Sequence, residues 1–530
     1  MLQSSSSSNW VVQKFGGTSV GKFPVKIVDD IIKFYSSPDN KEYNNNVAVV
    51  CSARSSSVKA EGTTSRLLKC CDLASQEMDF KPIIEMIRQD HIDNAERYIQ
   101  NAVLQTKLID DSNKELKLVD KYLEASKILG EVSTRTIDLV MSVGEKLSCL
   151  FITALCNDRG CKAKYVDLTH IVPSDYNSTV LDNSFYTFLF QAFKEKLQPF
   201  MNSKERIVPV FTGFFGLVPM GLLNGVGRGY TDLCAALIAV AANADELQVW
   251  KEVDGIFTAD PRKVPQARLL ASVTPEEASE LTYYGSEVIH PFTMEQVIQA
   301  KIPIRIKNVQ NPRGEGTIIY PDNVAKKGEC TPPHPPETLS SSFFEKKKRG
   351  ATAITTKNDI VVLNIHSNKK TLSHGFLAQI FTILDKYKLV VDLISTSEVH
   401  VSMALPIPDS DSMKSLRQAV EKLKVLGRVD VTKKMAIVSL VGKQMKQFIG
   451  IAGTMFTTLA EQGINIEMIS QGANEINISC VIDEVDSIKA LQSIHRNLLD
   501  AKIQETEEQK QENFEHAINE RLEQIKRLDL

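Results

Sequence analysis

Short runs of apolar residues alternate with longer amphipathic stretches from Asn9 to Asp322. The apolar runs are nearly continuous and rich in β-branched residues. This pattern predicts strands buried on both faces of a mostly parallel sheet, with helices between them. The polar stretch Lys81–Gly130 has no strand pattern and predicts helix. The expected strands are Trp10–Phe15, Val47–Ser52, Ile207–Thr212, Leu247–Trp250 and Pro303–Ile306.

This pattern breaks after Asp322. Thr331–Gly350 is rich in Pro and Ser and then basic, a composition that favours a linker or surface strap over a helix or inner strand. Its basic run Lys346–Arg349 also fits a nucleic-acid patch, but no other basic stretch supports that interpretation. We expect a disordered Ser-rich leader at 1–9, a layered α/β domain at 10–322 and a linker at 323–352.

An internal repeat fills most of the remaining chain. A β-like run, a Gly-led helix and the next strand recur 75 residues apart, and a further strand recurs 77 residues apart. Two copies are too few for a solenoid, so we expect paired βαββ modules at 353–431 and 432–504, then a charged helical tail at 505–530. The matched positions are Gly375, Phe381, Leu384, Asp392, Ile394 and Ser395 with Gly450, Phe456, Leu459, Glu467, Ile469 and Ser470.

Length and composition narrow the class of protein. The 530 residues allow three or four domains of roughly 150 residues each. With 43% hydrophobic and 24% charged residues and a net charge of −3, the chain has no footprint for nucleic acid or an anionic membrane. No apolar stretch reaches the roughly 18 residues of a membrane span, and the serine run is no signal peptide. The nine cysteines lack zinc-like spacing and predict reduced thiols in the cytoplasm.

The first candidate site is Lys14–Lys22, KFGGTSVGK, directly after the first strand. Its adjacent glycines let backbone N–H groups approach an anion, and the helix that follows favours negative charge. Lys14 adds a mobile cation suited to phosphate oxygens. A plain strand-to-helix turn with Thr18 or Ser19 as N-cap explains the same pattern, so both interpretations stay open.

Two nucleotide-binding motifs are not satisfied. Gly16 to Lys22 has the Walker A spacing, but Phe23 follows where that loop needs a hydroxyl, which argues against a P-loop NTPase. Asn224–Asp232, NGVGRGYTD, does not satisfy GxGxxG, so a Rossmann site is not supported. Its three glycines, at 225, 227 and 229, still offer a flexible anion cradle at a helix start.

Three charged residues are candidates for substrate contacts. Arg228 has the fork geometry that grips a carboxylate. Asp232 is suited to orienting a hydroxyl or a lysine, or to complementing a helix macrodipole. Glu145 ends the sequence SVGE, Ser142–Glu145, which has the pattern of a capping box before an apolar helix. The Glu145 carboxylate also suits a substrate ammonium, and the two roles are compatible.

The last candidate segment is Trp250–Arg262, WKEVDGIFTADPR, with two consecutive turns after a strand. Lys251 and Arg262 offer phosphate contacts, and Phe257 offers an apolar face to a base. A turn with no binding role would explain any one of these residues taken alone. Four such segments at the strand ends of one α/β sheet nevertheless point to a ligand site, because open sheets bind ligands there.

These motifs together resemble the aspartokinases, and in particular the fungal, yeast-type monofunctional members. KFGGTSV, SVGE, FTGFFG, GRGYTD, VDGIFTADPR and YYGSEVIHP occur in that family's order over roughly residues 10–500, and the repeat resembles its two ACT domains. The resemblance implies an amino-acid-kinase fold, an αβα sandwich on a mostly parallel open sheet, followed by two ferredoxin-like βαββαβ ACT domains. It also implies phosphorylation of L-aspartate by ATP to 4-phospho-L-aspartate and ADP, the first step towards threonine, methionine and isoleucine.

The resemblance also implies a role for each motif residue. Lys14 contacts the transferring phosphoryl group, and Asp232 orients that lysine. Glu145 holds the substrate ammonium, Arg228 holds the α-carboxylate, and Thr64 makes a further substrate contact. The implied ATP-binding residues are Gly16, Gly17, Thr18, Ser19, Thr231, Lys251, Glu252, Phe257 and Arg262.

The chain departs from many relatives at three places. Lys251 and Glu252 stand where those relatives have Thr-Asp, and Phe257 stands where they have Tyr. The missing hydroxyl leaves Phe257 with stacking or packing only. Glu287 stands where bacterial relatives carry a phosphate-contacting lysine, so that role is not assigned to it.

The implied mechanism needs no covalent enzyme intermediate, because the aspartate side chain is already an ionised nucleophile. The protein has to bring two anions together and offset the charge on the γ-phosphoryl oxygens. Mg²⁺ is expected to be held mainly by ATP oxygens and water, with no metal site built from protein side chains.

Regulation by an amino acid is implied through the ACT region. Threonine is the expected inhibitor, since fungi do not generally make lysine from aspartate, and ACT pairing predicts a homo-oligomer of at least two chains. Ordinary helix packing explains Phe376 and Leu377 equally well. The expected effector contacts are Ser373, Gly375, Phe376, Leu377, Asp392, Thr396 and Ser397.

Two other classes of protein fit part of the pattern. One is another amino-acid kinase, such as a glutamate kinase, because an arginine and a glutamate suit any amino acid. The other is a non-catalytic amino-acid sensor built on ACT modules, against which intact Lys14, Arg228 and Asp232 argue. A fused homoserine dehydrogenase, known in some relatives, is not expected because no dinucleotide-binding pattern follows Cys480.

Overall fold

The computed structural model describes residues 10–40, 45–55, 61–173, 176, 182–218, 221–227, 229–283, 289, 291–320, 350–367, 375–397, 400–445, 449–472 and 476–500. The expected leader and tail, most of the linker, Arg228, Glu287 and Ser373 lie outside the described residues. The chain divides into two compact units. The first is Met1–Ile256, Leu270–Pro275 and Ile289–Val324, and the second is Phe257–Leu269, Glu276–Val288 and Ala325–Leu530.

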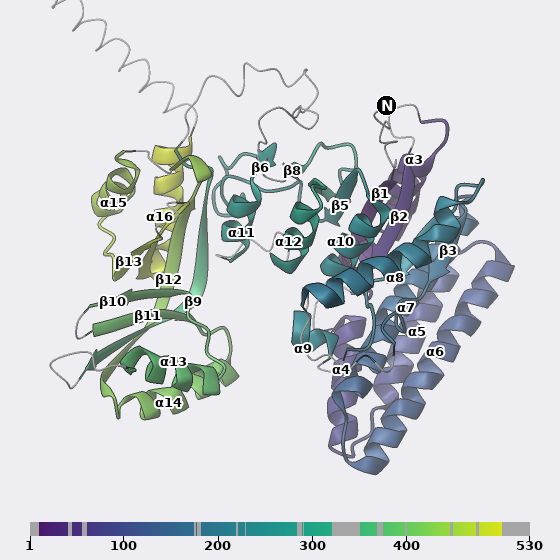
Figure 1. Ribbon diagram of the computed structural model, residues 1–530, viewed down its shortest axis with the longest axis horizontal. Coiled ribbons are helices and arrows are strands. Elements are labelled where there is room, and N and C mark those ends of the chain that lie inside the picture. The colour runs from purple at the N-terminus through teal and green to yellow at the C-terminus, as the bar shows by residue number, and fades with distance from the viewer. Residues whose placement is uncertain are drawn as a thin grey trace, which may run out of the picture. The chain divides into compact units, whose positions relative to one another are not determined.

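An eight-stranded sheet forms the centre of the first unit, in the order β3-β4-β2-β1-β5-β7-β8-β6 (Figure 1). All neighbours pair parallel except β7 and β8. The five expected strands are confirmed, with ends shifted by two residues at most. The strands are β1 (Trp10–Phe15), β2 (Asn46–Cys51), β3 (Ala163–Val166), β4 (Val208–Thr212), β5 (Glu246–Lys251), β6 (Ser272–Val273), β7 (Ile304–Asn308) and β8 (Thr317–Ile319).

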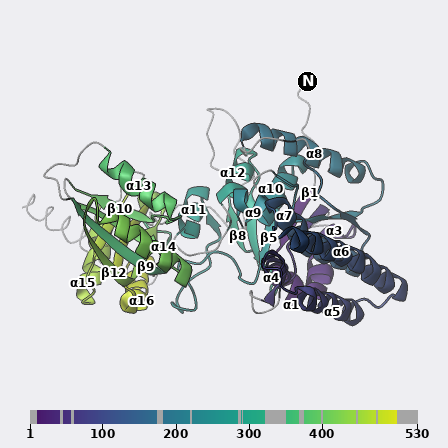
Figure 2. The same ribbon diagram turned by 90° about the horizontal axis from the view of Figure 1, so that it is seen from below.

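Helices cover both faces of this sheet, so the predicted αβα sandwich is confirmed (Figures 1 and 2). On one face, η1 and the second half of α7 bury large apolar side chains such as Phe15 and Trp250. On the other face, α10 packs against β1 and β5, with α8 and α12 beside it. The helices are α1 (Gly17–Lys22), α2 (Pro24–Lys26), η1 (Ile27–Ile32), α3 (Lys33–Ser36), α4 (Thr63–Ser75), α5 (Lys81–Tyr98), α6 (Ala102–Leu129), α7 (Thr134–Asp158), α8 (Asn183–Met201), α9 (Leu222–Val226), α10 (Tyr230–Ala242) and α12 (Pro291–Gln299).

Helix α7 links the sheet to a helical lobe. Its first half packs with α4, α5 and α6 in a second apolar core, and its second half packs on the sheet. By length and composition α7 could cross a membrane, but 78% of its most apolar window is buried inside the protein, as in a core helix. The helical structure expected over Lys81–Gly130 is confirmed as α5 and α6. Helix α6 is followed by its C-cap, Gly130, whose backbone is in the left-handed conformation with φ 66°.

The second unit is built on a six-stranded antiparallel sheet in the order β10-β11-β9-β12-β14-β13. Helices follow in the same order in each repeat, which confirms the predicted α+β modules. Its elements are α11 (Pro275–Tyr283), β9 (Ala353–Ser367), α13 (Phe376–Lys386), β10 (Leu393–Thr396), β11 (His400–Pro406), α14 (Ser410–Leu423), β12 (Gly427–Val441), η3 (Lys443–Met445), α15 (Ile451–Glu461), β13 (Met468–Gln471), β14 (Asn477–Asp483), η4 (Glu484–Asp486), α16 (Ser487–Ile494) and η5 (His495–Leu499).

The two repeats share their longest strands, β9 and β12. The second half of β9 pairs with β11 and with the first half of β12. The first half of β9 pairs with the second half of β12, which also pairs with β14. The first half of β12 completes a four-stranded βαββαβ module from within the first repeat. The second module takes its fourth strand, the first half of β9, from the first repeat. The repeat spacing did not predict this shared strand.

A separate apolar cluster joins the two modules on the strand faces turned away from the helices. Its eight members are four pairs of repeat-equivalent residues, which supports the alignment of the repeats. Three pairs are 75 residues apart and the fourth is 77 apart, as in the sequence. The pairs are Ile360 with Met435, Val362 with Ile437, Leu393 with Met468 and Ala404 with Val481.

Two segments from the expected catalytic domain belong to the second unit instead, Phe257–Leu269 and Glu276–Val288. In the first of them, Ala259 and Val264 are buried in the same core as α15 and α16. The Thr258 carbonyl accepts a hydrogen bond from the backbone N–H of Ile354, at 2.8 Å. The compact units therefore do not follow the order of the chain, and the domain boundaries stay a prediction.

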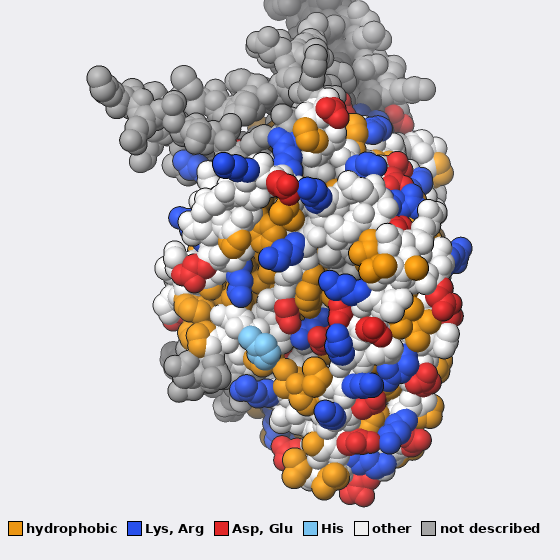
Figure 3. Space-filling model, turned by 90° about the vertical axis from the view of Figure 1, so that its right-hand side faces the viewer, with side chains coloured by type: hydrophobic (Ala, Val, Ile, Leu, Met, Phe, Trp, Pro, Cys, Tyr) orange, Lys and Arg blue, Asp and Glu red, His pale blue; other side chains and the backbone are white. Residues whose placement is uncertain are grey.

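Surface charge agrees with the composition. On the face in Figure 3, basic and acidic side chains are interspersed and do not gather into a patch of one sign. A net charge of −3 on 530 residues leads us to expect this mixture.

Candidate active site

Lys14 is a buried cation near the carboxyl end of β1. Its Nζ lies 2.7 Å from a carboxylate oxygen of Asp232, in the first turn of α10. The two side chains are only 10% and 15% exposed, so water screens their attraction weakly. The structure thus brings together the two residues that the sequence assigned to phosphoryl transfer.

Gly16 and Gly17, close to Lys14, differ in whether the packing around them requires glycine. A Cβ on Gly17 would lie 2.0 Å from the Ala53 carbonyl oxygen, so this glycine lets α1 pack against the loop after β2. A Cβ on Gly16 would meet nothing within 4 Å, so packing does not require glycine there. The N-cap of α1 is Gly16 and no side chain caps it, so the alternative with Thr18 or Ser19 as N-cap is wrong.

The capping box predicted at Ser142–Glu145 is also wrong. These residues lie in the middle of the 25-residue helix α7, whose N-cap is Ser133. The Ser142 hydroxyl donates to the Leu139 carbonyl, one turn earlier, at 2.8 Å. The Ser-x-x-Glu pattern is local, whereas the helix continues through it because apolar side chains on both sides are buried.

Glu145 is a buried carboxylate with one oxygen engaged. The Tyr230 hydroxyl donates to its Oε1 at 2.7 Å, and Oε2 has no hydrogen-bond partner within the part of the chain that the structure describes. Burial raises the pKa of Glu145 to about 7, while the Tyr230 hydroxyl and the Ala53 N–H act in the opposite direction. Such a group can accept a hydrogen bond from a cationic ligand.

The first turn of α10 joins these groups into one site. Tyr230, Thr231 and Asp232 are its first residues, and Thr231 Oγ1 accepts a hydrogen bond from the Ser52 hydroxyl at 3.0 Å. Gly229 is the N-cap of α10, as expected for a cradle at a helix start. The sequence did not single out Tyr230, although it lies inside the GRGYTD motif that supplied its neighbours.

Thr64 lies in the first turn of α4 and is half-buried. This turn packs on α7 beside the glutamate. A Cβ on Gly144 would lie 2.8 Å from the Ala53 Cβ and 3.6 Å from the Thr63 Cγ2. The loop after β2, the start of α4 and the centre of α7 therefore meet close to Glu145.

The expected nucleotide residues fall in both units. Lys251 ends β5, and the neighbouring Glu252 pairs with Lys22 at 3.2 Å. Phe257 and Arg262 belong to the second unit. The Arg262 side chain is 87% exposed and forms a bidentate pair with Asp260, at 3.0 and 2.9 Å.

The expected effector residues that the structure describes lie at the start of α13 and on or next to β10. Gly375 is the N-cap of α13 with φ 86°, and a Cβ there would have no neighbour within 4 Å. Phe376 is buried, and Leu377 is 38% exposed. Asp392 has a side chain that is 1% exposed and pairs with Lys357 at 2.6 Å, a partner that the sequence did not predict.

Two further expected effector residues, Thr396 and Ser397, are exposed. The Ser397 N–H donates to the His400 carbonyl at 2.9 Å.

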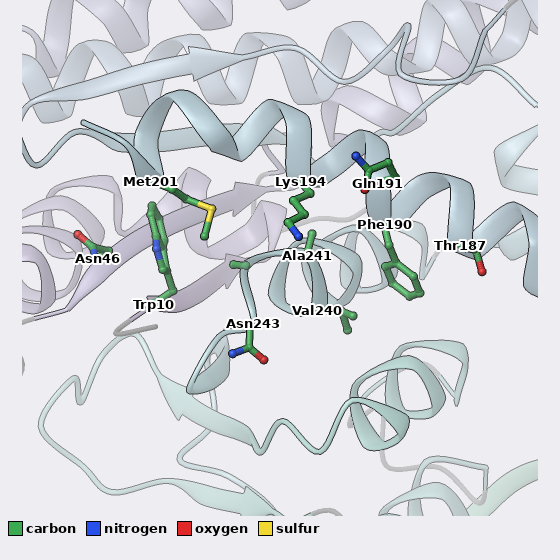
Figure 4. Close-up of a pocket in the computed structure, with 11 residues that line it drawn as sticks. Trp10, Asn46, Thr187, Phe190, Gln191, Lys194, Met201, Val240, Ala241 and Asn243 are labelled. Atoms are coloured by element: carbon green, nitrogen blue, oxygen red, sulfur yellow. The ribbon is translucent and has the colours of Figure 1, made fainter. Parts of the chain in front are cut away.

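A separate hollow lies at the opposite, amino-terminal edge of the sheet (Figure 4). It measures about 780 Å³ and is bounded by Trp10 at the start of β1, Asn243 just after α10, and the helix α8. Phe190 and Lys194 of α8 also border it (Figure 4). None of the expected site residues lines this hollow.

The fold and the site together define a class of protein. Residues 9–308 match the amino acid kinase family, and residues 438–498 match an ACT domain. The first match covers more than half of the chain, which therefore belongs to the amino acid kinase family. Within it the chain groups with the aspartokinases, because it is 82% identical over 526 residues to the aspartokinase of Saccharomyces cerevisiae, covering 99% of this chain and 98% of that protein.

Solved structures agree with this assignment. E. coli aspartokinase III in complex with lysine and aspartate superposes with a TM-score of 0.72 at 26% identity, over 93% of this chain and 100% of that one. The same enzyme in complex with aspartate and ADP gives a TM-score of 0.69 at 25% identity, over 92% and 100%. The resemblance inferred from the motifs is confirmed.

Proposed function

We propose that the chain is an aspartate kinase, which transfers the γ-phosphoryl group of ATP to the side-chain carboxylate of L-aspartate. The products are 4-phospho-L-aspartate and ADP, as the first step of threonine, methionine and isoleucine biosynthesis. The proposal rests on one observation. At the first turn of α10, a lysine paired with an aspartate adjoins a buried glutamate. A cation for a phosphoryl group and an acceptor for an ammonium are what an amino-acid kinase needs side by side.

Substrate recognition is assigned to three side chains. Glu145 holds the ammonium of aspartate with its Oε2, which Tyr230 leaves available by binding Oε1. Arg228 grips the α-carboxylate, and the Thr64 hydroxyl makes a further contact. Burial strengthens the attraction between Glu145 and the ammonium, because the surroundings have a low dielectric constant.

The transfer itself is a direct displacement. A side-chain oxygen of aspartate forms the new bond to the γ-phosphorus, and the bond from that phosphorus to the ADP oxygen breaks. No proton moves, because the nucleophile is a carboxylate and ADP leaves as an anion. Lys14 and the N–H groups of Gly16, Gly17, Thr18 and Ser19 stabilise the charge on the transferring oxygens, while Asp232 holds Lys14 in place.

Mg²⁺ is proposed to enter with ATP, held by phosphate oxygens and water. Among the residues described, no group of three or more His, Cys, Asp or Glu side chains is arranged for a metal ion. Asp232, the carboxylate nearest to Lys14, already pairs with that lysine. Bound Mg²⁺ offsets phosphate charge, and the protein adds Lys14 and the loop N–H groups.

The remaining nucleotide contacts are assigned to Thr231, Lys251, Glu252, Phe257 and Arg262. Lys251 and Arg262 supply positive charge, and Phe257 supplies an apolar surface without the hydroxyl of a tyrosine. Glu252 pairs with Lys22, so its contribution is to order that lysine at the end of α1.

The effector is proposed to be L-threonine, bound by Ser373, Gly375, Phe376, Leu377, Asp392, Thr396 and Ser397. A lysine effector would bring a second ammonium. Among the described candidates the one carboxylate is that of Asp392, which is assigned to the α-ammonium that every amino-acid effector carries, so a second ammonium would find no further carboxylate among them. The exposed hydroxyls of Thr396 and Ser397 suit a hydroxyl-bearing amino acid instead. Isothermal titration tests this, and heat with lysine but none with threonine contradicts it.

We also propose a homo-oligomer in the cytoplasm. Leu377 and Phe381 on α13 and Ile394 on the edge strand β10 are large apolar side chains that are 38%, 41% and 38% exposed, as in a surface that a second copy covers. The eight cysteines that the structure describes are free and buried, in keeping with a reducing compartment. Light scattering on the purified chain is expected to give at least twice the monomer mass, and a monomer at micromolar concentration contradicts this.

The activity is tested by a coupled assay for ADP release. We expect release with ATP and L-aspartate, little with L-glutamate and none without an acceptor, and we expect L-threonine to suppress it. Release with glutamate as fast as with aspartate would favour a different amino-acid kinase. Binding of threonine without any ADP release would favour a sensor.

A further inference from the structure

The segment that runs from α9 to the start of α10 is attached to helix α7 at both ends. At its later end, the Tyr230 hydroxyl donates to Glu145 Oε1 at 2.7 Å. At its earlier end, the Leu222 N–H donates to Asp138 Oδ2 at 2.9 Å. The two carboxylates are seven residues apart on α7, which is about two turns and places them on one face of the helix.

The earlier attachment is buried and closely packed. Asp138 is 1% exposed, and burial raises its pKa to about 6, while the N–H groups of Leu222 and Leu223 favour the ionised form. Gly221 has φ 79°, and a Cβ there would lie 2.4 Å from the Thr134 Cγ2 on α7. Glycine therefore allows the backbone to come close enough for the Asp138 carboxylate to meet both N–H groups.

We propose that Asp138 is a positioning residue for substrate recognition. It holds the start of α9 against the helix that carries Glu145, and Tyr230 attaches the start of α10 to the same helix. Arg228 comes between these two attachments in the sequence. The ammonium and α-carboxylate of an amino acid are attached to one carbon, so the two groups that bind them have to keep a fixed separation. Asp138 itself touches no substrate. The proposal rests on the roles proposed above for Glu145 and Arg228.

Steady-state kinetics of the full chain test this role. In Asp138→Ala the two N–H groups lose a charged acceptor. We expect the KM for L-aspartate to rise about tenfold or more, the size expected for one lost charge-assisted hydrogen bond. The change in kcat and in the KM for ATP is expected to stay below about threefold, because Lys14 is not touched. Asp138→Asn keeps a neutral acceptor and is expected to lie between Asp138→Ala and the wild type.

A matched control separates positioning from stability. Asp182 caps α8 in the same unit by accepting from the N–H groups of Ser184 and Phe185 at 3.0 and 3.1 Å. Asp182 is exposed, unlike Asp138, so Asp182→Ala removes a helix cap away from the site and is expected to lower the Tm slightly without changing the KM for aspartate.

The outcomes distinguish this proposal from the function on which it rests. An unchanged KM for aspartate in Asp138→Ala overturns the positioning role. If that variant does not fold, an unchanged KM in Asp138→Asn overturns it equally. Glu145→Gln is measured in parallel, and a normal KM for aspartate there would refute the assignment of Glu145, whatever Asp138 does.

Discussion

Two carboxylates, the half-buried Asp232 and the buried Glu145, lie close to the first turn of α10 and differ in how their charge is compensated. Lys14 neutralises Asp232 at 2.7 Å. Glu145 forms no ion pair among the described residues; the neutral Tyr230 hydroxyl donates to one of its oxygens, and burial raises its pKa to about 7. Asp232 therefore has a cationic partner within the protein, whereas in the proposed function the cationic partner of Glu145 is the substrate ammonium.

The raised pKa of Glu145 has a predictable effect on stability. Between its ordinary pKa of 4.5 and about 7, the folded protein binds more protons than the unfolded chain. The ligand-free protein therefore loses stability as the pH rises through that window. We predict that Glu145→Gln, which removes the buried charge, raises the Tm at pH 8 and changes it little at pH 5. Thermal melts at the two pH values measure this, and equal shifts at both contradict it.

The sequence predicted some residues of the candidate sites but not their partners. Lys14, Glu145 and Asp232 were found because each lies in a short motif. The partners Tyr230 and Lys357 were missed, since Tyr230 is 85 residues from Glu145 along the chain and no local pattern connects Lys357 with Asp392. Pairings of this kind depend on the tertiary fold.

At the scale of elements, hydrophobic patterning located the central strands because their residues are almost all buried. It failed where a local pattern competes with tertiary packing. The Ser142–Glu145 pattern resembles a helix start, yet α7 runs through it with buried residues on both sides. The repeat spacing revealed two modules, but the pairing of β9 with β12 across both modules joins strands that are far apart in the sequence.

Two neighbouring glycines give a matched test of helix α1. In Gly17→Ala the new Cβ would lie 2.0 Å from a backbone carbonyl, so we predict that the Tm falls by about 5 °C or more. In Gly16→Ala the Cβ meets nothing within 4 Å, and φ is −72°, so the Tm is expected to stay nearly unchanged. The KM for ATP is expected to rise in Gly16→Ala, because the methyl group intrudes where phosphate approaches. Equal Tm losses in both variants would contradict this division of roles.

At the scale of the whole molecule, the chain combines a kinase sandwich with an interlocked pair of ACT modules. Strands β9 and β12 run through both modules and an apolar cluster joins them, so we expect the two modules to respond to an effector together. Segment Phe257–Leu269 carries expected nucleotide residues but packs in the core of the second module.

The Asp392 carboxylate provides a test of the proposed effector site. Asp392→Asn removes the carboxylate assigned to the effector ammonium, so we predict that L-threonine binds at least about tenfold more weakly. Asp411→Asn is the control, because Asp411 is exposed in the same module and pairs with Lys414 at 2.8 Å. Isothermal titration of both variants provides the measurement. Unchanged affinity in Asp392→Asn would remove this residue from the effector site.

The central claim is that Lys14, held by Asp232, stabilises the transferring phosphoryl group. The most direct measurement is kcat for ADP release with saturating ATP and L-aspartate in Lys14→Ala, with a thermal melt to establish that the variant is folded. We predict a fall in kcat of about 100-fold or more with a modest change in Tm. A folded Lys14→Ala variant that turns over at a near-normal rate would contradict it.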